Sequence, residues 1–257
     1  VFEMLSEFLP IDVFGVFLVF VRMAAALMIM PGIGEAYIPV QIRLGAAAML
    51  TLAISPIVLP TIPTLPELPI QLFLLILGEL VIGLLIGAAA RLTMSALHVA
   101  GTVIAFQSSL GFALFVDPTQ GTQGALVATF LTLLGLVLIF ASGLHMLTLR
   151  ALADSYILFN PGSLPSVGDF SALAVRYISS SFKVGIQIAA PFIVFSLTFY
   201  VGLGVLARLL PQIQVFFIGI PLQIFLALTI LSIVIAPAMI WFLDHFELRF
   251  IELLADR

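Results

Sequence analysis

The sequence contains no cysteine and very little charge. Of its 257 residues, 63% are apolar and only 9% are charged, whereas about a quarter of the residues in soluble globular domains are charged. So few charges cannot form a polar surface around a buried core, which excludes a soluble enzyme, a disordered regulator and a nucleic-acid binder. The lack of cysteine excludes a disulfide framework, a thiolate metal site and a cysteine nucleophile. An integral membrane protein remains.

Basic residues and amphipathic aromatic residues are also scarce. A single lysine, Lys183, leaves no polybasic patch for lipid head groups or nucleic acid. There are 23 Phe but only four Tyr and one Trp, and Tyr and Trp are the residues that form belts at membrane interfaces. This scarcity indicates that lipid is not the main neighbour of the helices. Gly83 and Gly87 form a GxxxG step, which is typical either of ordinary internal helix packing or of an extensive protein–protein interface.

Long apolar runs dominate the sequence and predict an all-α protein. A membrane-spanning helix needs about 20 apolar residues; five of the runs reach that length, and the first two are marginal. The last run contains Pro221 and Pro237 and is predicted to form two helical pieces. The seven runs cover residues 13–30, 44–59, 68–90, 92–116, 124–149, 184–206 and 213–243.

The basic residues between these runs predict an orientation. If all seven runs cross the membrane, one side collects seven basic residues and the other collects only Arg208. Under the positive-inside rule this asymmetry predicts an external N-terminus and a cytoplasmic C-terminus. The seven are Arg43, Arg91, Arg150, Arg176, Lys183, Arg249 and Arg257.

A polar segment, residues 150–183, divides the chain. Its turn dipeptides predict a solvated connector with one short helix over residues 170–181. We therefore expect one helical subunit with N-terminal helices over residues 13–149 and a C-terminal hairpin and tail over 184–257. No internal repeat of the kind found in many secondary transporters is evident.

Two charged residues lie inside apolar runs. Arg22 and Glu79 are expensive to bury, so each is a functional candidate by default. Arg22 is either part of a structural ion pair or an aqueous face, or it has a role in transport. Glu79 is a candidate for a proton relay.

No pattern predicts catalysis, a metal or a cofactor. The histidines show no HxxxH spacing. Hydrolase, metalloprotease and phosphate-binding motifs are absent. We therefore expect a protein that is not an enzyme, with no catalytic residue, metal ligand or cofactor.

The segment 106–121 carries the most information. It starts as a helix, contains Gln107 and two serines, and ends at Asp117-Pro118, because proline disfavours helix at the preceding residue. One interpretation is a plain helix end followed by an external loop. The other is a loop that folds into a pore and closes it with phenylalanines. The candidate pore-closing residues are Gly111, Phe112, Phe115, Val116, Asp117 and Pro118.

Short motifs along nearly the whole chain resemble one known family. They begin with Arg22, Pro31, Pro39 and Arg43-Leu44-Gly45, and continue with Gly83, Gly87, Gln107, Phe112, Phe115-Val116-Asp117-Pro118 and Gly143-Leu144-His145. The last is the segment 208–222, which includes Pro211, Gln212, Phe216, Gly219 and Pro221. In combination these motifs are similar to the flagellar biosynthetic protein FliR family.

The resemblance implies a subunit of the flagellar type III protein export gate, located in the bacterial inner membrane within the flagellar basal body. One such subunit joins FliP-like and FliQ-like subunits in a helical assembly that conducts unfolded flagellar proteins. FlhB-like and FlhA-like components associate with it, and the subunit itself is not an enzyme. Pairs of its helices are implied to form hairpins that face partner subunits.

The resemblance also implies a role for the loop at residues 108–123. In this family the matching loop plugs the closed pore, and Phe112 and Phe115 would supply its apolar contacts. A homologous subunit of a virulence injectisome is the first alternative. A stand-alone secondary transporter that uses Arg22 and Glu79 is the second.

Overall fold

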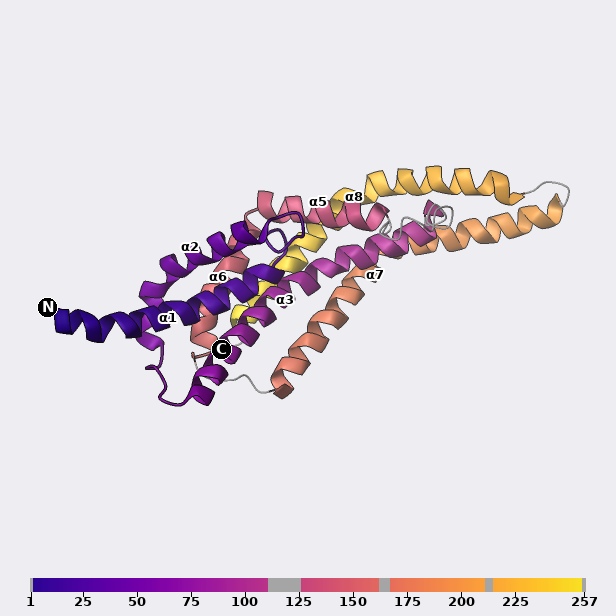
Figure 1. Cartoon of the computed structure of the whole chain (residues 1–257). Coiled ribbons are helices and arrows are strands. Elements are labelled where there is room, and N and C mark those ends of the chain that lie inside the picture. The colour runs from indigo at the N-terminus through magenta and orange to yellow at the C-terminus, as the bar shows by residue number, and fades with distance from the viewer. Residues whose placement is uncertain (1, 111–125, 162–166, 211–214, 256–257) are drawn as a thin grey trace. The chain divides into compact units, whose positions relative to one another are not determined.

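Helices account for all regular secondary structure in the part of the chain that the computed structural model describes, which is residues 2–110, 126–161, 167–210 and 215–255 (Figure 1). This confirms the predicted all-α class. The candidate pore-closing residues 111–118 lie outside the described residues, as do Pro211 and Gln212.

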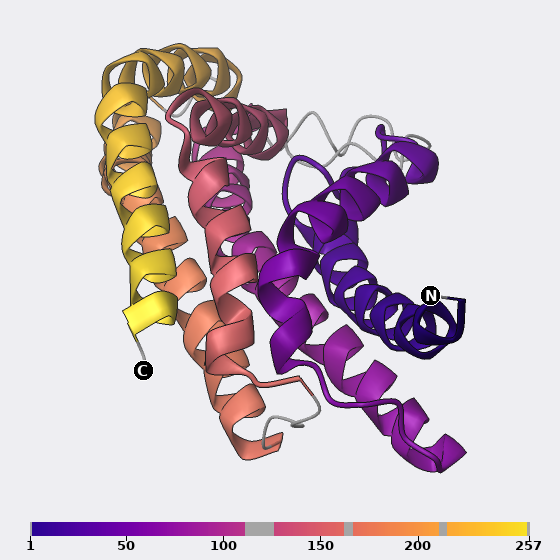
Figure 2. The ribbon, with the colours of Figure 1, turned by 90° about the vertical axis from the view of Figure 1, so that its left-hand side faces the viewer.

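The first two helices are α1 (Phe2–Ile29) and α2 (Val40–Val58), which pack against each other (Figure 2). Helix α2 starts directly after Pro39, whose backbone is extended, and a short 3-10 helix, η1 (Leu59–Thr61), follows it. The proline-rich segment that comes next contains no helix or strand until α3 begins.

Helix α3 (Pro69–Gln107) starts at a proline, which is compatible with a first helical position because that position needs no N–H donor. It continues from the run 68–90 into the run 92–116 as far as Gln107, although Arg91 was expected to separate the two runs. That separation was wrong, because arginine is a good helix former. Arg91 is half exposed and lies 3.5 Å from Glu35.

The fifth apolar run is broken. Helices α5 (Leu126–Ala141) and α6 (Leu144–Leu158) meet at a bend of 75°. Gly143 occupies the bend with a φ of 79°, a left-handed conformation that glycine adopts at little cost. The motif Gly143-Leu144-His145 therefore marks the start of α6.

Two long helices complete the chain: α7 (Val167–Leu209) and α8 (Val215–Ala255). Two predictions are wrong here. Pro221 and Pro237 do not divide the last run, since both lie within α8. The helix expected over residues 170–181 continues without a break into the run 184–206 as α7. Polar composition marked an exposed surface in this segment, not the absence of a helix.

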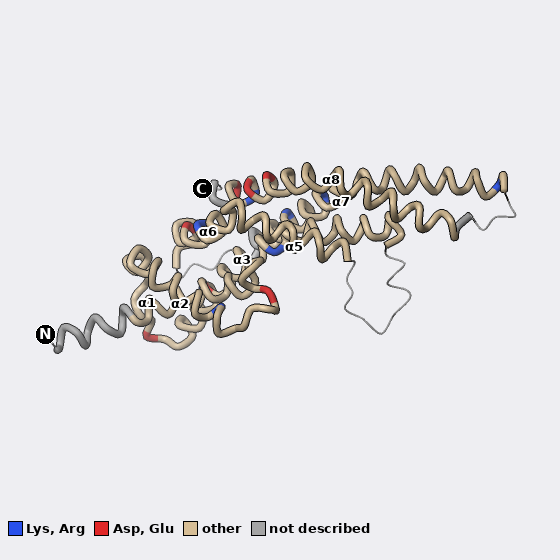
Figure 3. The backbone as a smooth tube through the Cα atoms, turned by 90° about the horizontal axis from the view of Figure 1, so that it is seen from above, with Lys and Arg blue, Asp and Glu red and all other residues tan. Residues whose placement is uncertain are grey.

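The chain divides into two compact units, each with its own packing. The first unit comprises residues 1–93, 143–177 and 247–257, and one core cluster in it brings together Val19 and Met23 of α1, Ile82 and Ile86 of α3, and Leu152 of α6. The second unit comprises residues 94–142 and 178–246. Charged residues are rare in the second unit (Figure 3), where Asp117, Lys183, Arg208 and Asp244 are the members of that class.

Four of the described helical segments are long and apolar enough to cross a membrane, or five if the bent pair α5 and α6 counts as one span. The seven-crossing topology is therefore wrong, because it required the chain to reverse direction near Arg91 inside α3. The orientation derived from that topology loses its basis. The four segments are Val40–Thr61, Pro69–Gln107, Ser171–Leu209 and Phe217–Glu252.

Candidate functional site

The two charges predicted inside apolar runs bind each other. Arg22 of α1 donates from Nε to Glu79 Oε2 of α3 at 2.6 Å and from Nη2 to Glu79 Oε1 at 3.0 Å. The residues are 0% and 1% exposed. This two-pronged geometry matches the planar guanidinium to the carboxylate and uses both of its oxygens.

Helix α6 supplies the remaining groups around Arg22. The guanidinium donates from Nη1 to Ser155 Oγ at 3.1 Å and from Nη2 to the Phe159 carbonyl, just beyond the end of α6, at 3.2 Å. Its carbon Cζ lies 3.9 Å from the centre of the Tyr156 ring, within range of a cation–π interaction. We call Arg22, Glu79, Ser155, Tyr156 and Phe159 the arginine cluster.

The GxxxG step of α3 explains how α1 approaches closely enough to form this cluster. A Cβ atom at Gly83 would collide with the backbone carbonyl of Arg22, and one at Gly87 would lie 2.5 Å from the carbonyl of Ala26. The two glycines therefore follow α1 one turn apart, at Arg22 and Ala26. In this chain the step packs two of its own helices, which favours the internal-packing interpretation for this motif.

The geometry of the arginine cluster favours a structural role over transport. A proton relay or a substrate site needs a group that can change partners. Both oxygens of Glu79 are bound to Arg22, and Arg22 has further acceptors on α6. The pair and the further bonds of Arg22 join three helices. Removing either partner would destabilise the fold, because the other charge would stay buried without its counter-ion.

Other motif residues of the first unit build the connection between α1 and α2. Arg43 donates to the carbonyls of Ile38, at 3.0 and 2.8 Å, and of Glu35, at 2.7 Å. These bonds hold the chain between Pro31 and Pro39 in a compact turn. The role of Arg43 is therefore local, and sequence spacing alone did not indicate it.

A second polar cluster lies in the second unit, at the end of α3. Gln223 of α8 donates from Nε2 to the backbone carbonyl of Gln107 at 2.8 Å, and Ser109 donates from Oγ to Gln223 Oε1 at 2.9 Å. Ser196 of α7 donates to Gln107 Oε1 at 2.6 Å. We call Gln107, Ser109, Ser196 and Gln223 the glutamine cluster; it is uncharged and joins three helices.

The glutamine cluster accommodates a strained residue. Ser109 has a φ of 59°, the left-handed region that non-glycine residues seldom occupy. Its buried side chain is held by Gln223, which compensates for this conformation. Gln107 was named from its motif, whereas Ser196 and Gln223 were missed. Their only signal is a polar side chain within a very apolar helix.

The remaining motif residues lie in α8 or outside the described residues. Gly219 lets α8 approach α7, because a Cβ there would lie 3.0 Å from both methyl groups of Leu203. Pro221 and Phe216 are within α8. Those outside the described residues are Pro211, Gln212 and the pore-closing candidates Gly111, Phe112, Phe115, Val116, Asp117 and Pro118.

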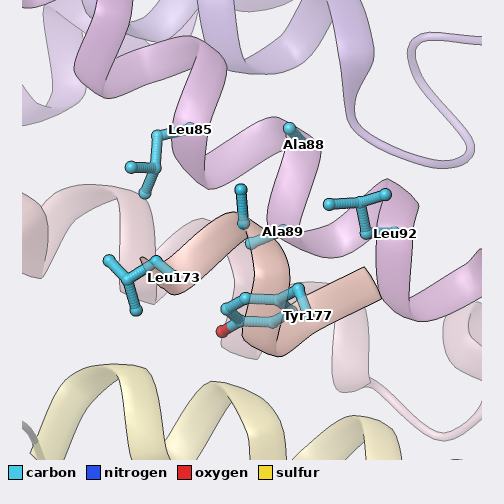
Figure 4. A pocket seen from close by; sticks show the side chains of 7 residues that line it. Leu85, Ala88, Ala89, Leu92, Leu173 and Tyr177 are labelled. Atoms are coloured by element: carbon cyan, nitrogen blue, oxygen red, sulfur yellow. The ribbon is translucent and has the colours of Figure 1, made fainter. Parts of the chain in front are cut away.

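A small apolar groove in the first unit offers no chemistry for a ligand. It has a volume of about 40 Å³, and the Tyr177 hydroxyl already donates a hydrogen bond to the Arg249 carbonyl at 3.4 Å. Among the described residues, no group of His, Asp and Glu could hold a metal ion. Figure 4 shows the groove, which is lined by Leu85, Ala88, Ala89 and Leu92 of α3 and by Leu173, Ala174 and Tyr177 of α7.

Known proteins resemble this chain over most of its length. The family model for bacterial export proteins, family 1, matches residues 13–248. The flagellar biosynthetic protein FliR of Caulobacter vibrioides is 40% identical over 225 residues, which are 87% of this chain and 90% of that protein. FliR of Escherichia coli is 28% identical over 240 residues, 91% of this chain and 89% of that protein.

A relative outside the flagellar proteins also matches. Yop proteins translocation protein T of Yersinia pestis is 26% identical over 220 residues, which are 82% of each chain. The resemblance to the FliR family that the sequence motifs indicated is confirmed by the family match and the flagellar relatives. The chain therefore belongs to family 1 of the bacterial export proteins.

Proposed function

We propose that this chain is a non-enzymatic subunit of the flagellar type III protein export gate and helps to form the pore for unfolded flagellar proteins. The 40% identity to a flagellar relative favours a flagellar gate. The first alternative is the homologous subunit of a virulence injectisome, for which the identity to the Yersinia relative is lower, 26%.

The observation that carries this proposal is the apolar surface left open on α7 and α8. Three residues on each helix recur at helical spacing and are largely exposed. Because Tyr and Trp are scarce, we propose that partner helices cover these faces in the gate. The proposed partners are FliP-like, FliQ-like, FlhB-like and FlhA-like components. The exposed residues are Val194, Leu197 and Val201 of α7, and Ile218, Leu222 and Phe225 of α8.

The segment 108–123 is the proposed plug of the pore. Phe112 and Phe115 would close it as a hydrophobic constriction. Support comes from the described residues at its start, because the glutamine cluster, which includes Ser109, holds the end of α3 where this segment begins. We further propose that the whole chain acts as one subunit in the inner membrane, within the flagellar basal body.

A stand-alone transporter would require Arg22 and Glu79 to bind a substrate or to move protons. Their mutual hydrogen bonds and full burial favour a gate subunit in which this pair holds the fold.

Resting ion conductance of the assembled gate tests the plug. We expect the double change Phe112→Ala and Phe115→Ala to raise the resting conductance, because the smaller side chains no longer fill the constriction. Phe112→Leu with Phe115→Leu is the matched control, since it retains apolar bulk and should leak less. Equal conductance of the alanine variant and the unmodified complex would contradict the plug.

A further inference from the structure

Three helices meet where the chain leaves α3. The last turn of α3 supplies the Gln107 carbonyl, and Ser109 follows it with its side chain only 4% exposed. Gln223 of α8 contacts both of these residues, and Ser196 of α7 contacts the side chain of Gln107. Ser109 lies in the first residues of the segment 108–123 proposed as the plug, and the candidate pore-closing residues begin two residues later, at Gly111.

We propose that Gln223 and Ser196 are positioning residues of the gate. They fix the end of α3 on α7 and α8 and thereby set the point from which the plug segment starts. The connection to the plug rests on the proposed function, whereas the anchoring of α3 is a property of the chain itself.

The orientation of the Gln223 amide makes this anchor specific. A backbone carbonyl can only accept a hydrogen bond, so the atom that faces the Gln107 carbonyl must be the donor Nε2. The carbonyl oxygen Oε1 then faces the Ser109 hydroxyl, which donates to it. One side chain thus binds the helix end at two points. A carboxylate at position 223 has the same shape but would direct an oxygen at the Gln107 carbonyl.

The bonds of Ser196 make the anchor releasable. Its hydroxyl has one proton and two acceptors in reach, Gln107 Oε1 at 2.6 Å and the Ile193 carbonyl of its own helix at 3.0 Å. When α7 moves away from the end of α3, the hydroxyl can keep the bond to Ile193. The cluster contains no charge, so its separation leaves no buried ion unpaired. These are the properties that a gate needs at a contact that opens and closes.

Thiol labelling tests the anchor independently of conductance. The chain has no cysteine, so Ser108→Cys introduces a single thiol next to the cluster, at a side chain that is 1% exposed and bonds to its own helix. In membranes that contain the assembled complex, we expect Gln223→Glu to accelerate maleimide labelling of this thiol roughly tenfold, because the helix end is released. Gln187→Glu makes the same chemical change at an exposed position of α7 and should leave the rate unchanged.

Equal labelling rates in the Gln223→Glu complex and the unmodified complex, with both fully assembled, would overturn the anchor. A rate increase confined to Gln223→Glu supports it.

Resting conductance of the same complexes then separates the anchor from the plug. Increased conductance with Gln223→Glu, but not with Gln187→Glu, supports the positioning role. If the double variant Phe112→Ala with Phe115→Ala raises the resting conductance and Gln223→Glu does not, the positioning role is wrong and the proposed function stands. If neither variant raises the resting conductance above that of the unmodified complex, both the plug and the positioning role are wrong.

Discussion

The arginine cluster and the glutamine cluster differ in how they satisfy buried polar groups. Each buries polar groups where three apolar helices meet, α1, α3 and α6 in one case and α3, α7 and α8 in the other. The first uses an ion pair. The second uses neutral amides and hydroxyls. Breaking a buried ion pair costs about 3–5 kcal/mol, whereas a neutral hydrogen bond contributes only about 0.5–1.5 kcal/mol.

This difference indicates that the arginine cluster is suited to holding the fold and that the glutamine cluster is suited to a contact that moves. The guanidinium of Arg22 bonds to Glu79, Ser155 and the Phe159 carbonyl, so separation of its helices would strand a charge in an apolar core. In the glutamine cluster, Ser196 already has a second acceptor on its own helix. We therefore expect the arginine cluster to stay intact and the glutamine cluster to open and close.

The largest effect is expected from Glu79→Ala. This change leaves the Arg22 guanidinium buried without its counter-ion, and we expect the free energy of unfolding to fall by about 3–5 kcal/mol. Thermal unfolding of the purified chain in detergent measures it. A loss below about 1 kcal/mol, the range of exposed ion pairs, would contradict a stabilising role for the pair.

The matched control removes both charges at once. Arg22→Met combined with Glu79→Leu should be more stable than Glu79→Ala alone, because apolar side chains of similar length leave no unpaired ion. A double variant less stable than the single variant would mean that packing, and not charge, dominates at this position.

Gly83→Ala should have the next largest effect. The added Cβ collides with the Arg22 carbonyl, so α1 and α3 must separate, at a cost of about 1–3 kcal/mol. Gly45→Ala in α2 is the control, since nothing lies within 4 Å of its Cβ position. It should raise stability by about 0.4–1 kcal/mol. If both variants behave alike in thermal unfolding, the close approach at Gly83 is not a constraint.

Ser196→Ala should cost about 0.5–1.5 kcal/mol, the contribution of one neutral hydrogen bond, because it removes the donor to Gln107 Oε1. Thr198→Ala, two residues away on α7, removes an exposed hydroxyl that bonds only to its own helix and should be close to neutral. A loss of stability in Ser196→Ala as large as that in Glu79→Ala would contradict this difference, since the glutamine cluster would then hold its helices as firmly as the arginine cluster does.

The smallest effect is expected from Tyr156→Phe. The Tyr156 hydroxyl is buried and has no hydrogen-bond partner among the described residues. Its removal should change stability by less than about 0.5 kcal/mol, since the ring beside Arg22 remains. Tyr156→Leu removes the ring and should lose about 1–2 kcal/mol of cation–π energy. Equal losses in the two variants would locate the contribution in the hydroxyl.

Composition was sufficient to predict the fold class, but not the ends of the helices. Arg91 was expected to separate two helices and does not, because a single arginine is compatible with a helix. Gly143 was not expected to break one and does, with a φ of 79° that glycine adopts at little cost. The first error treated a charge as the end of a helix. The second arose because a glycine is compatible with both a helix and a bend, and composition does not choose between them.

The candidate site was predicted only in part, because its contacts join residues that lie far apart in the sequence. Arg22 and Glu79 could be singled out because burying a charge is costly, but their pairing joins residues 57 apart in sequence. Ser196 and Gln223 could not be distinguished from Gln187 and Ser232, which are also polar residues in apolar helices but are exposed. Only the arrangement of α3, α7 and α8 separates the two kinds.

Affinity purification of this chain from its native membranes tests the proposed gate most directly. We expect a stable hetero-complex that contains FliP-like and FliQ-like subunits and retains the chain after mild detergent extraction, because the apolar faces of α7 and α8 are then covered by partner helices. Recovery of the chain as a monomer or a symmetric homo-oligomer that moves a small solute across liposome membranes would contradict this function.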